Sequence, residues 1–477
     1  MGNITSDLNK IGFRKERNNA SAAYIAAYTS AYRVGFGGVQ ATPVAIPVTD
    51  CLGWDKPDGE LEIPEPLRKK EELNVIGDGP KTADVVEMGY ETVEQAITVN
   101  AQTGIWLYYV MGGYSCDGTD LSSPITQAAV TKVSVLVMGG FSGLVVNAHV
   151  GRIVRQTSAG ATQYWCWTIV SNTATELTLN SPIPDDVATE DVEILMAPFT
   201  HTITEPSTTA TQVASNSQVY LPSFIIHFEQ SDGTNIEYRD LIGCLVKSLK
   251  ITLEKGAKVM YEVTVLVPKS MVGLVQTAYP TYALSGDATR AALSYPTDEI
   301  FGWYDFDLAE SYLTYNSVAV FGSTQNWFNE LGKLEITISH ELEILPIQGD
   351  PYPYKVLNGK LDYEVLMTYY PNSNEDQDPT TFTTYRLLKS LKRMKLAEYT
   401  TNLAMRVRLQ RSATDYVQLT FSSLYVTEFP DKLTTIEEKQ VSIDVTMRNA
   451  PAKGSVTAGS LAVVVVDDRN PSYYGDT

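Results

Sequence analysis

Histidine is the residue type in this chain best suited to acid–base or metal chemistry near neutral pH. The 477-residue sequence has four histidines in unrelated segments, His149, His201, His227 and His340. His227 and His340 each fall within a strand-like run, where a histidine in the core or on a sheet face is the simpler interpretation. The spacing therefore predicts no histidine-based catalytic or metal site.

Clustered carboxylates could bind Ca²⁺ weakly, because hard cations take oxygen ligands. None of the clusters has the spacing of an EF-hand loop, so solvated acidic loops are the simpler interpretation. The clusters are Asp185 with Asp186, Glu190 with Asp191, Asp305 with Asp307, and Glu375 with Asp376 and Asp378.

The signatures of common enzyme classes are missing from the sequence. It contains no Gly-x-Ser-x-Gly nucleophile elbow and no phosphate-binding Gly-x-x-x-x-Gly-Lys-Ser/Thr loop. Its four cysteines form no Cys-x-x-Cys pair, so free thiols are expected. Tryptophans could form sugar platforms, although a core role is simpler for Trp106, Trp165, Trp167, Trp303 and Trp327. We therefore expect no catalytic residue, no metal and no cofactor.

The bulk composition is that of a globular protein with two or three domains, with 44% hydrophobic and 19% charged residues. The net charge of −20 argues against a protein that grips nucleic acid through its phosphates, which requires a basic face. The longest apolar run, 133–146, is interrupted by glycines and too short to span a bilayer, so no membrane contact is expected.

The segment 219–269 organises the rest of the chain, as three strand-like runs joined by turns. In its last run Val259, Tyr261 and Val263 alternate with polar residues, so they share one face of a strand. Turn-forming clusters at 231–233 and 255–256 separate the runs.

A second copy of this pattern occupies 405–449, with residues 412–415 in the place of the first turn. The elements that precede the two copies also correspond: strands at 91–101 and 359–370, then helices at 105–111 and 385–395. The basic face of the later helix could touch DNA or an acidic neighbour, although a solvated face is simpler. Because the whole order recurs, the sequence predicts an internal duplication.

This order of elements resembles the tail tube proteins of long-tailed, siphovirus-like bacteriophages or archaeal viruses. The likeness covers most of 34–115 and 219–450 and rests on no single motif. The stretches that carry it are YRVGFGGVQATPVAIPVTD, EIPEPLRKKEELNVIGDGPK, GYETVEQAITVNAQTGIWLYYVMGG, PSFIIHFEQSDGTNIEYRDLIGCLVKSLKITLEKGAKVMYEVTVLV, KLEITISHELEILPIQGDPYPYKVLNGKLDYEVLMTYY and EEKQVSIDVTMRNAP.

The resemblance implies a mainly β fold with two tube-type units, each a β-sandwich or half-barrel with a flanking α-helix. A small all-β module is inserted in the first unit. The expected organisation is an N-terminal arm (1–33), a first tube-type domain (34–130 and 205–270), the inserted module (131–204), a linker (271–298), a second tube-type domain (299–452) and a C-terminal tail (453–477).

The resemblance also implies self-assembly into stacked rings that form the hollow tail tube of a virion, through which DNA passes without specific binding. Two tube domains per chain predict a homotrimeric, pseudo-hexameric ring; a single split domain predicts a homohexamer. The implied partners are the tail terminator, tail-tip and tape-measure proteins. The loops 51–88 and 346–358 would contact the adjoining ring, through Pro66, Arg68, Lys69, Lys70, Glu71, Tyr352 and Tyr354.

Two other classes remain open. The chain could be another structural protein of a virion or cell surface, such as an adhesin or a baseplate component. It could also be a carbohydrate-binding or glycan-active protein built from β-sandwich domains.

Overall fold

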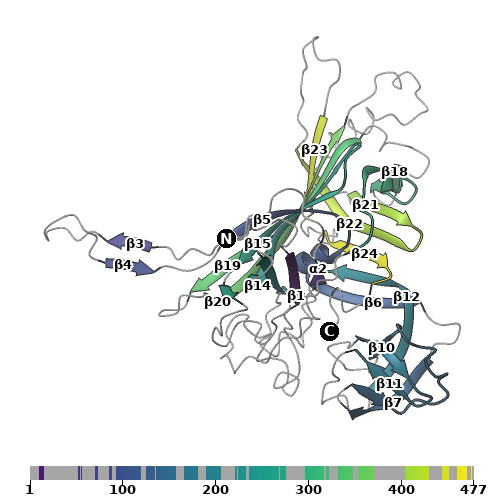
Figure 1. Ribbon diagram of the computed structural model, residues 1–477. Helices are drawn as coiled ribbons and strands as arrows, with labels where there is room; N and C mark the ends of the chain where they lie inside the picture. Colours follow the sequence, from purple (N-terminus) through teal and green to yellow (C-terminus); the bar gives the residue numbers. More distant parts are fainter. Residues whose placement is uncertain are drawn as a thin grey trace, which may run out of the picture.

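The computed structural model describes the chain in segments that together contain most of its predicted strands (Figure 1). The described residues are 10–15, 52–53, 55, 70–73, 85–88, 93–119, 125–134, 136–156, 166–180, 190–205, 221–222, 224–231, 236–267, 269–274, 296–315, 318–321, 331–346, 353–369, 403–428, 443–450, 459–469 and 474. The predicted helix 385–395 and the strand-like segment 34–48 lie outside them.

The prediction of a mainly β protein is confirmed. Backbone pairing joins 22 strands of the described residues, and β3 pairs separately with β4. The strands before residue 205 are β1 (Lys10–Lys15), β2 (Leu52–Gly53), β3 (Lys70–Leu73), β4 (Val85–Met88), β5 (Val93–Asn100), β6 (Gly113–Thr119), β7 (Ile125–Ser134), β8 (Val137–Gly139), β9 (Ile153–Gln156), β10 (Cys166–Asn172), β11 (Glu176–Leu179) and β12 (Glu190–Thr204).

The later strands carry both copies of the repeated pattern. They are β13 (Phe224–Ser231), β14 (Ile236–Glu254), β15 (Met260–Val267), β16 (Lys269–Leu274), β17 (Tyr312–Tyr315), β18 (Val318–Phe321), β19 (Leu331–Pro346), β20 (Pro353–Tyr369), β21 (Leu403–Ser412), β22 (Asp415–Glu428), β23 (Ile443–Asn449) and β24 (Leu461–Asp467). The described helices are α2 (Ile105–Met111) and the short 3-10 helix η3 (Trp303–Asp305).

The two copies have the same pairing order, which sequence reasoning had only suggested. In the first copy β14 pairs with β15, which pairs with β5. In the second copy β22 pairs with β23, which pairs with β20. The long strand of each copy also changes partner along its length. Strand β14 pairs first with β13 and then with β15, and β22 pairs first with β21 and then with β23. The order of strands in space thus recurs along with their order in the sequence.

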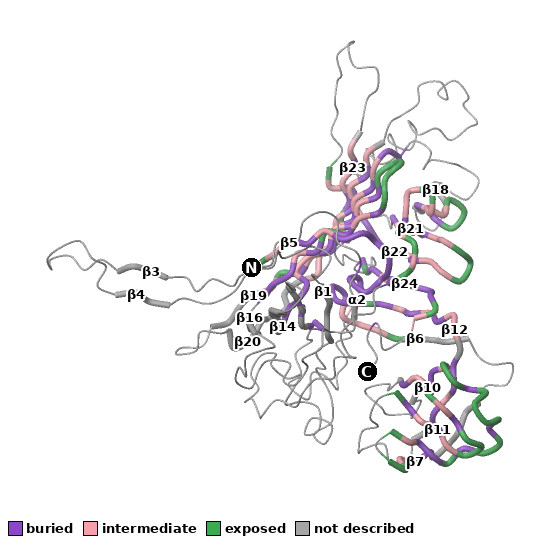
Figure 2. Tube along the Cα trace, viewed as in Figure 1, coloured by how far each residue is buried: buried purple, intermediate pink, exposed green. Residues whose placement is uncertain are grey.

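Strand β19 joins the two copies into one antiparallel sheet. One of its edges pairs with β14 and the other with β20, so the order across the sheet is β5-β15-β14-β19-β20-β23-β22. One row of directly opposed residues crosses all seven strands: Val99, Tyr261, Ile251, Ile336, Val365, Met447 and Val426. Every residue of that row is buried. Figure 2 shows the central strands mostly in the colours of buried and intermediate residues.

The predicted helix 105–111 is confirmed as α2, which packs on the buried face of the central sheet against β14 and β19. Its side chains are bulky and apolar, and Trp106, Leu107 and Val110 are buried in the main core. The helix ends at Gly112, whose φ of 88° is a conformation that favours glycine and that lets its N–H bond to the Tyr108 carbonyl.

Residues 130–194 contribute a separate hydrophobic core, within the region where the inserted module was predicted. Trp167 and Met138 lie at its centre, and β7 to β11 with the first half of β12 surround it. The second half of β12 instead pairs with β6 and β24 of the main sheet. The same strand therefore belongs to both cores.

Candidate functional site

Three of the seven residues predicted to contact an adjoining ring lie on described strands. Lys70 and Glu71 lie on β3, which pairs with β4 in a hairpin that extends away from the main sheet at the left of Figure 1. Tyr354 lies on β20, near the end where Pro346 pairs with Pro353. The other four residues of this set lie outside the described residues: Pro66, Arg68, Lys69 and Tyr352. Contact with another ring stays a prediction for all seven.

The four histidines lie on different parts of the fold. The His340 ring bonds the Val110 carbonyl at 2.6 Å, at the C-terminal end of α2, and burial lowers its pKa despite that bond. His149 lies in the inserted module, where burial and then the Arg152 charge lower its pKa. His227 lies on β13 and His201 on β12.

One of the predicted acidic pairs, Asp305 with Asp307, has local structural partners. Asp305 accepts the Gly302 N–H at 2.7 Å, and Asp307 accepts the N–H groups of Ala309 and Glu310. Such bonds close turns, as aspartate side chains commonly do. Among the residues that the structure describes, no group of three or more His, Cys, Asp or Glu side chains could hold a metal ion.

Two of the tryptophans are too deeply buried to stack against a sugar. Trp106 is 1% exposed in the main core and Trp167 is 2% exposed in the core of the module. Trp303 is partly buried and stacks against Phe306. Trp165 and Trp327 lie outside the described residues.

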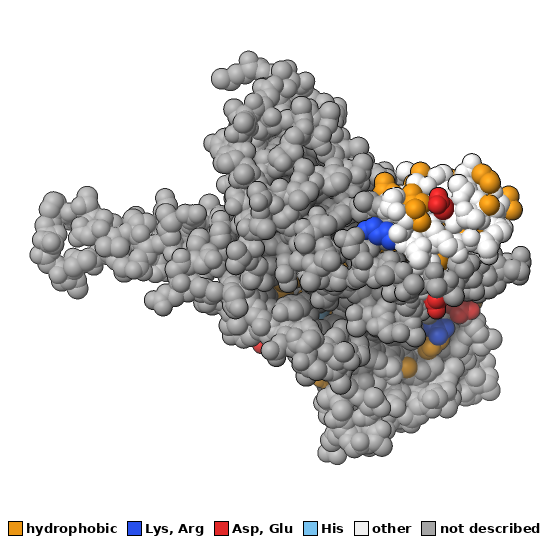
Figure 3. Space-filling model, turned by 90° about the horizontal axis from the view of Figure 1, so that it is seen from below, with side chains coloured by type: hydrophobic (Ala, Val, Ile, Leu, Met, Phe, Trp, Pro, Cys, Tyr) orange, Lys and Arg blue, Asp and Glu red, His pale blue; other side chains and the backbone are white. Residues whose placement is uncertain are grey.

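Exposed aliphatic side chains concentrate on the inserted module. Figure 3, which looks at the chain from this side, shows orange apolar side chains on the module among white atoms, which are the backbone and the other uncharged side chains. The side chains are Val133, Leu136, Val145, Val146, Val150 and Val170. The buried Asn172 amide fixes the loop that holds two of them, since it donates to the Val145 carbonyl at 2.8 Å and accepts the His149 N–H at 3.1 Å.

Most of the described face of the central sheet opposite α2 is polar, apart from a buried apolar cluster of Leu221, Leu245 and Leu266 at one end, and we call it the polar sheet face. One row of directly opposed residues crosses it: Thr98, Glu262, Lys250, Thr337, Glu364, Arg448 and Tyr425. Among the side chains that the structure describes, carboxylates outnumber basic groups on this face: Glu94, Glu254, Glu262, Glu335, Asp362, Glu364, Glu428 and Asp444 against Lys247, Lys250, Lys333 and Arg448.

Each of those four basic groups is neutralised by a carboxylate of the same face. Lys250 and Lys333 both reach Glu335, at 2.9 and 2.8 Å. Burial opposes ionisation of Glu335, but the hydrogen bonds and charges of the two lysines prevail and lower its pKa. Lys247 pairs with Glu94, and Arg448 with Glu364 and Asp362. All four positive charges are therefore in ion pairs, whereas the carboxylates of Glu254 and Glu262 are exposed.

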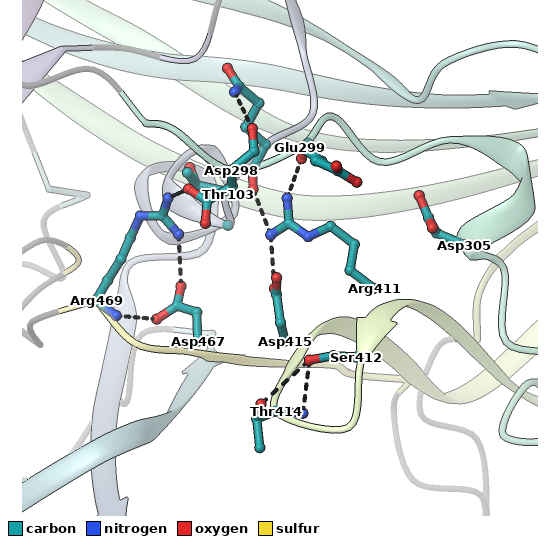
Figure 4. A network of polar contacts seen from close by, with 12 residues as sticks. Thr103, Asp298, Glu299, Asp305, Arg411, Ser412, Thr414, Asp415, Asp467 and Arg469 are labelled. Atoms are coloured by element: carbon teal, nitrogen blue, oxygen red, sulfur yellow. Dashed lines mark hydrogen bonds and ion pairs between the residues drawn. The ribbon is translucent and has the colours of Figure 1, made fainter.

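Two arginines organise a buried polar cluster at the N-terminal end of α2, which we call the hub (Figure 4). Arg469, just after β24, forms ion pairs with Asp298 and Asp467. Arg411, at the end of β21, pairs with Asp415 at 2.8 Å and donates to the carbonyls of Gln102 and Glu299. The hub thereby ties together segments that are far apart in the sequence.

Asp55 is the most deeply buried carboxylate of the hub, with no exposed surface. The Thr103 hydroxyl lies 3.1 and 3.3 Å from its two oxygens. Burial raises the pKa of Asp55 to about 7, although the Thr103 hydrogen bond and the Arg469 charge act in the opposite direction. Burial, and then the charge of Asp55, also raises the pKa of the Tyr261 hydroxyl.

Behind the hub, a chain of hydrogen bonds runs from Asp467 to the surface of β6. The His201 ring lies 2.9 Å from Asp467 and 2.8 Å from the Tyr114 hydroxyl. Tyr474 donates to the other oxygen of Asp467 at 2.5 Å. The order tyrosine, histidine, aspartate has the form of a proton relay, but His201 has no exposed surface for a substrate.

Sequence reasoning missed the hub. Its members come from a predicted loop, a linker, a hairpin and a polar tail, and no local spacing connects them.

Comparison of the chain with models of known protein families finds no match, and comparison with curated proteins finds no significant similarity. Among the described residues, no helix has both the length and the apolar character that a membrane crossing requires.

Proposed function

We propose that the chain is a structural, non-enzymatic virion protein whose copies close into rings, and that these rings stack into the tail tube through which viral DNA leaves the particle. The observation that carries this proposal is the strand order β5-β15-β14-β19-β20-β23-β22, in which a group of three strands occurs twice with β19 between the groups.

Among the described strands, this seven-stranded sheet has an unpaired edge at each end. Among the described strands, β5 pairs on one edge only, with β15. At the other end, the part of β22 that follows Leu424 pairs with β23 and with no other described strand. Open edges of this kind invite pairing with another chain, and closure into a ring removes them.

The junction inside the chain indicates how a second copy would add. Strand β19 precedes β20 in the sequence and bridges it to β14 of the other unit. The strand predicted within 34–48 precedes β5 in the same way, so it would bridge β5 to β22 of a neighbouring chain. Each unit then contributes four strands, an even number that keeps every pair antiparallel around the ring.

Two such units per chain favour the homotrimeric, pseudo-hexameric ring over the homohexamer. The polar sheet face then lines the lumen, because the other face carries α2 and the core. Its basic groups are paired and its excess charge is negative, so it would repel phosphate and let DNA slide. The hairpins β3–β4 and β19–β20 would meet the next ring, and the terminator, tail-tip and tape-measure proteins would meet the ends and lumen of the tube.

The mass of the smallest closed assembly tests the ring, by native mass spectrometry of the purified 52.5 kDa chain. Three copies are the expected result. Six copies would retain the ring but contradict the equivalence of the two units. A monomer at every concentration and salt condition would contradict the proposal and favour a surface structural protein.

A further inference from the structure

We propose that Arg406 and Arg408 on β21 form a receptor for the carboxylates of an acidic protein segment, and that the side chain of Glu310 occupies this receptor until such a segment binds. The inference goes beyond the proposed function, because it requires neither a ring nor a tube.

The two arginines share the outer face of a second sheet, whose order is β18-β17-β21-β22-β24-β12-β6. Met405, Val407 and Leu409 of the same strand are buried in the main core. Because side chains alternate along a strand, Arg406 and Arg408 lie together on the face turned away from that core. Their side chains are 29% and 15% exposed.

Both guanidinium groups have N–H donors that no described residue accepts. The Nε–H groups of Arg406 and Arg408 are buried and have no hydrogen-bond partner. The Oε2 atom of Glu310 lies 3.6 Å from Nη1 of Arg406 and 3.9 Å from Nη1 of Arg408, and Oδ2 of Asp307 lies 3.7 Å from Nε of Arg408. These ion pairs balance charge but exceed hydrogen-bond length. Since donors without an acceptor are costly, a closer acceptor would be bound favourably.

Aromatic rings hold the two guanidinium groups in place without using their donors. The Cζ atom of Arg408 lies 3.7 Å from the centre of the Tyr416 ring, and that of Arg406 lies 4.7 Å from the centre of the Tyr312 ring. Such stacking fixes the plane of a guanidinium group and leaves its edge free to bind a carboxylate. One oxygen of Glu310 lies within 4.0 Å of both arginines, so a single carboxylate can bridge them.

The turn beside the receptor is firmly attached to β21, apart from Glu310 itself. The N–H of Asp307 donates to the Arg408 carbonyl at 2.9 Å, and the Ser311 hydroxyl accepts the Arg408 N–H at 3.0 Å. The Asp307 carboxylate also accepts two N–H groups of the turn. The Glu310 carboxylate has no hydrogen bond among the described residues and its side chain is 48% exposed. It is therefore the part of the site that another carboxylate can displace.

The charge of the site favours a protein carboxylate over nucleic acid. Asp307 and Glu310 balance the two arginines, so the site lacks the excess positive charge that phosphate backbones require, and the chain as a whole carries −20. A side-chain carboxylate that replaces Glu310 keeps the local balance. It also gains the short, charge-assisted hydrogen bonds that Glu310 does not form.

Fluorescence anisotropy of a fluorescein-labelled hexaglutamate peptide with the unassembled full-length chain tests the receptor at low ionic strength. Glu310→Gln should bind the peptide roughly three- to tenfold more tightly than the wild type, because the internal competitor is gone, and Arg406→Gln should bind it roughly tenfold more weakly. Arg406→Lys keeps the charge but should still weaken binding, because the stacked, forked donor is lost. Arg448→Gln makes the same charge change on the polar sheet face and should leave the affinity within about a factor of two.

Three results would overturn the receptor. The first is unchanged or weaker binding by Glu310→Gln. The second is an equal loss of affinity in Arg406→Gln and Arg448→Gln, which would make the effect one of net charge. The third is wild-type binding of a short oligothymidylate as tight as that of the peptide, which would make the site a phosphate reader. Circular dichroism checks the folding of each variant, and Glu310→Gln decides the question alone if the arginine variants do not fold.

Discussion

Leu249 on β14 lies directly opposite Ile338 on β19, and both side chains are completely buried. Their contact joins two halves of the chain that the sequence predicts as separate tube-type domains. The main hydrophobic core runs through both halves without interruption. Unfolding of one half therefore removes the core of the other.

Substitution of Ile338 should destabilise the chain as one unit. Ile338→Ala removes buried methylene and methyl groups from the junction, at a cost of about 2–5 kcal/mol in the free energy of unfolding. Thr337→Ala, on the same strand but on the polar sheet face, should cost less than about 0.5 kcal/mol. Urea titration followed by circular dichroism and tryptophan fluorescence measures both. Separate transitions for the two halves would contradict a shared core.

The inserted module should unfold without taking the main sheet with it, because it has its own core. Trp167→Ala is expected to cost the module about 3–5 kcal/mol, with the melting of the main body unchanged. Val170→Ala on the same strand is the matched control, since its side chain is 54% exposed. Differential scanning calorimetry separates the two events. Loss of the main transition in Trp167→Ala would show that the module supports the main sheet.

His340 should make the folded chain less stable in acid. Burial lowers the pKa of His340, so its contribution to stability is complete above its unfolded pKa of about 6.5 and is lost as the pH falls below it. His340→Gln keeps an N–H donor for the Val110 carbonyl but cannot titrate. Its unfolding free energy should change less between about pH 7.5 and 5.5 than that of the wild type. Equal changes in both chains would exclude this role.

The polar sheet face should acquire DNA affinity when its charge is reversed. Glu335→Lys removes the carboxylate that neutralises Lys250 and Lys333, so three lysines would stand together. Rings of this variant should bind short double-stranded DNA with an affinity that falls steeply with salt. Glu176→Lys in the module makes the same charge change away from this face. Fluorescence anisotropy compares them, and equal affinity of both variants would argue against a lumenal face.

The alternation of apolar and polar residues was enough to predict much of the sheet. Val259, Tyr261 and Val263 are all completely buried, and the turn at Gly256 has the positive φ that favours glycine. The predicted turn at 412–415 is likewise a hairpin, with Ser412 opposite Asp415. These features depend on neighbours in the sequence, which local pattern reveals.

Which strands pair with each other could not be predicted from such local patterns. The 19 residues of β14 form one strand that exchanges β13 for β15, and the tail strand β24 pairs with β22 and β12 of the main sheet. Both facts depend on pairings between distant segments. The hub depends on them too, because Arg469 reaches Asp298 only after β24 has taken its place in the sheet.

The most direct test of the central claim is electron microscopy of the purified chain at increasing concentration. The account predicts hollow filaments with a regular axial repeat and an end view of three chains arranged with pseudo-sixfold symmetry. Particles that stay single or close into discrete oligomers without a central channel, even when a tail-tip nucleus is added, would contradict it.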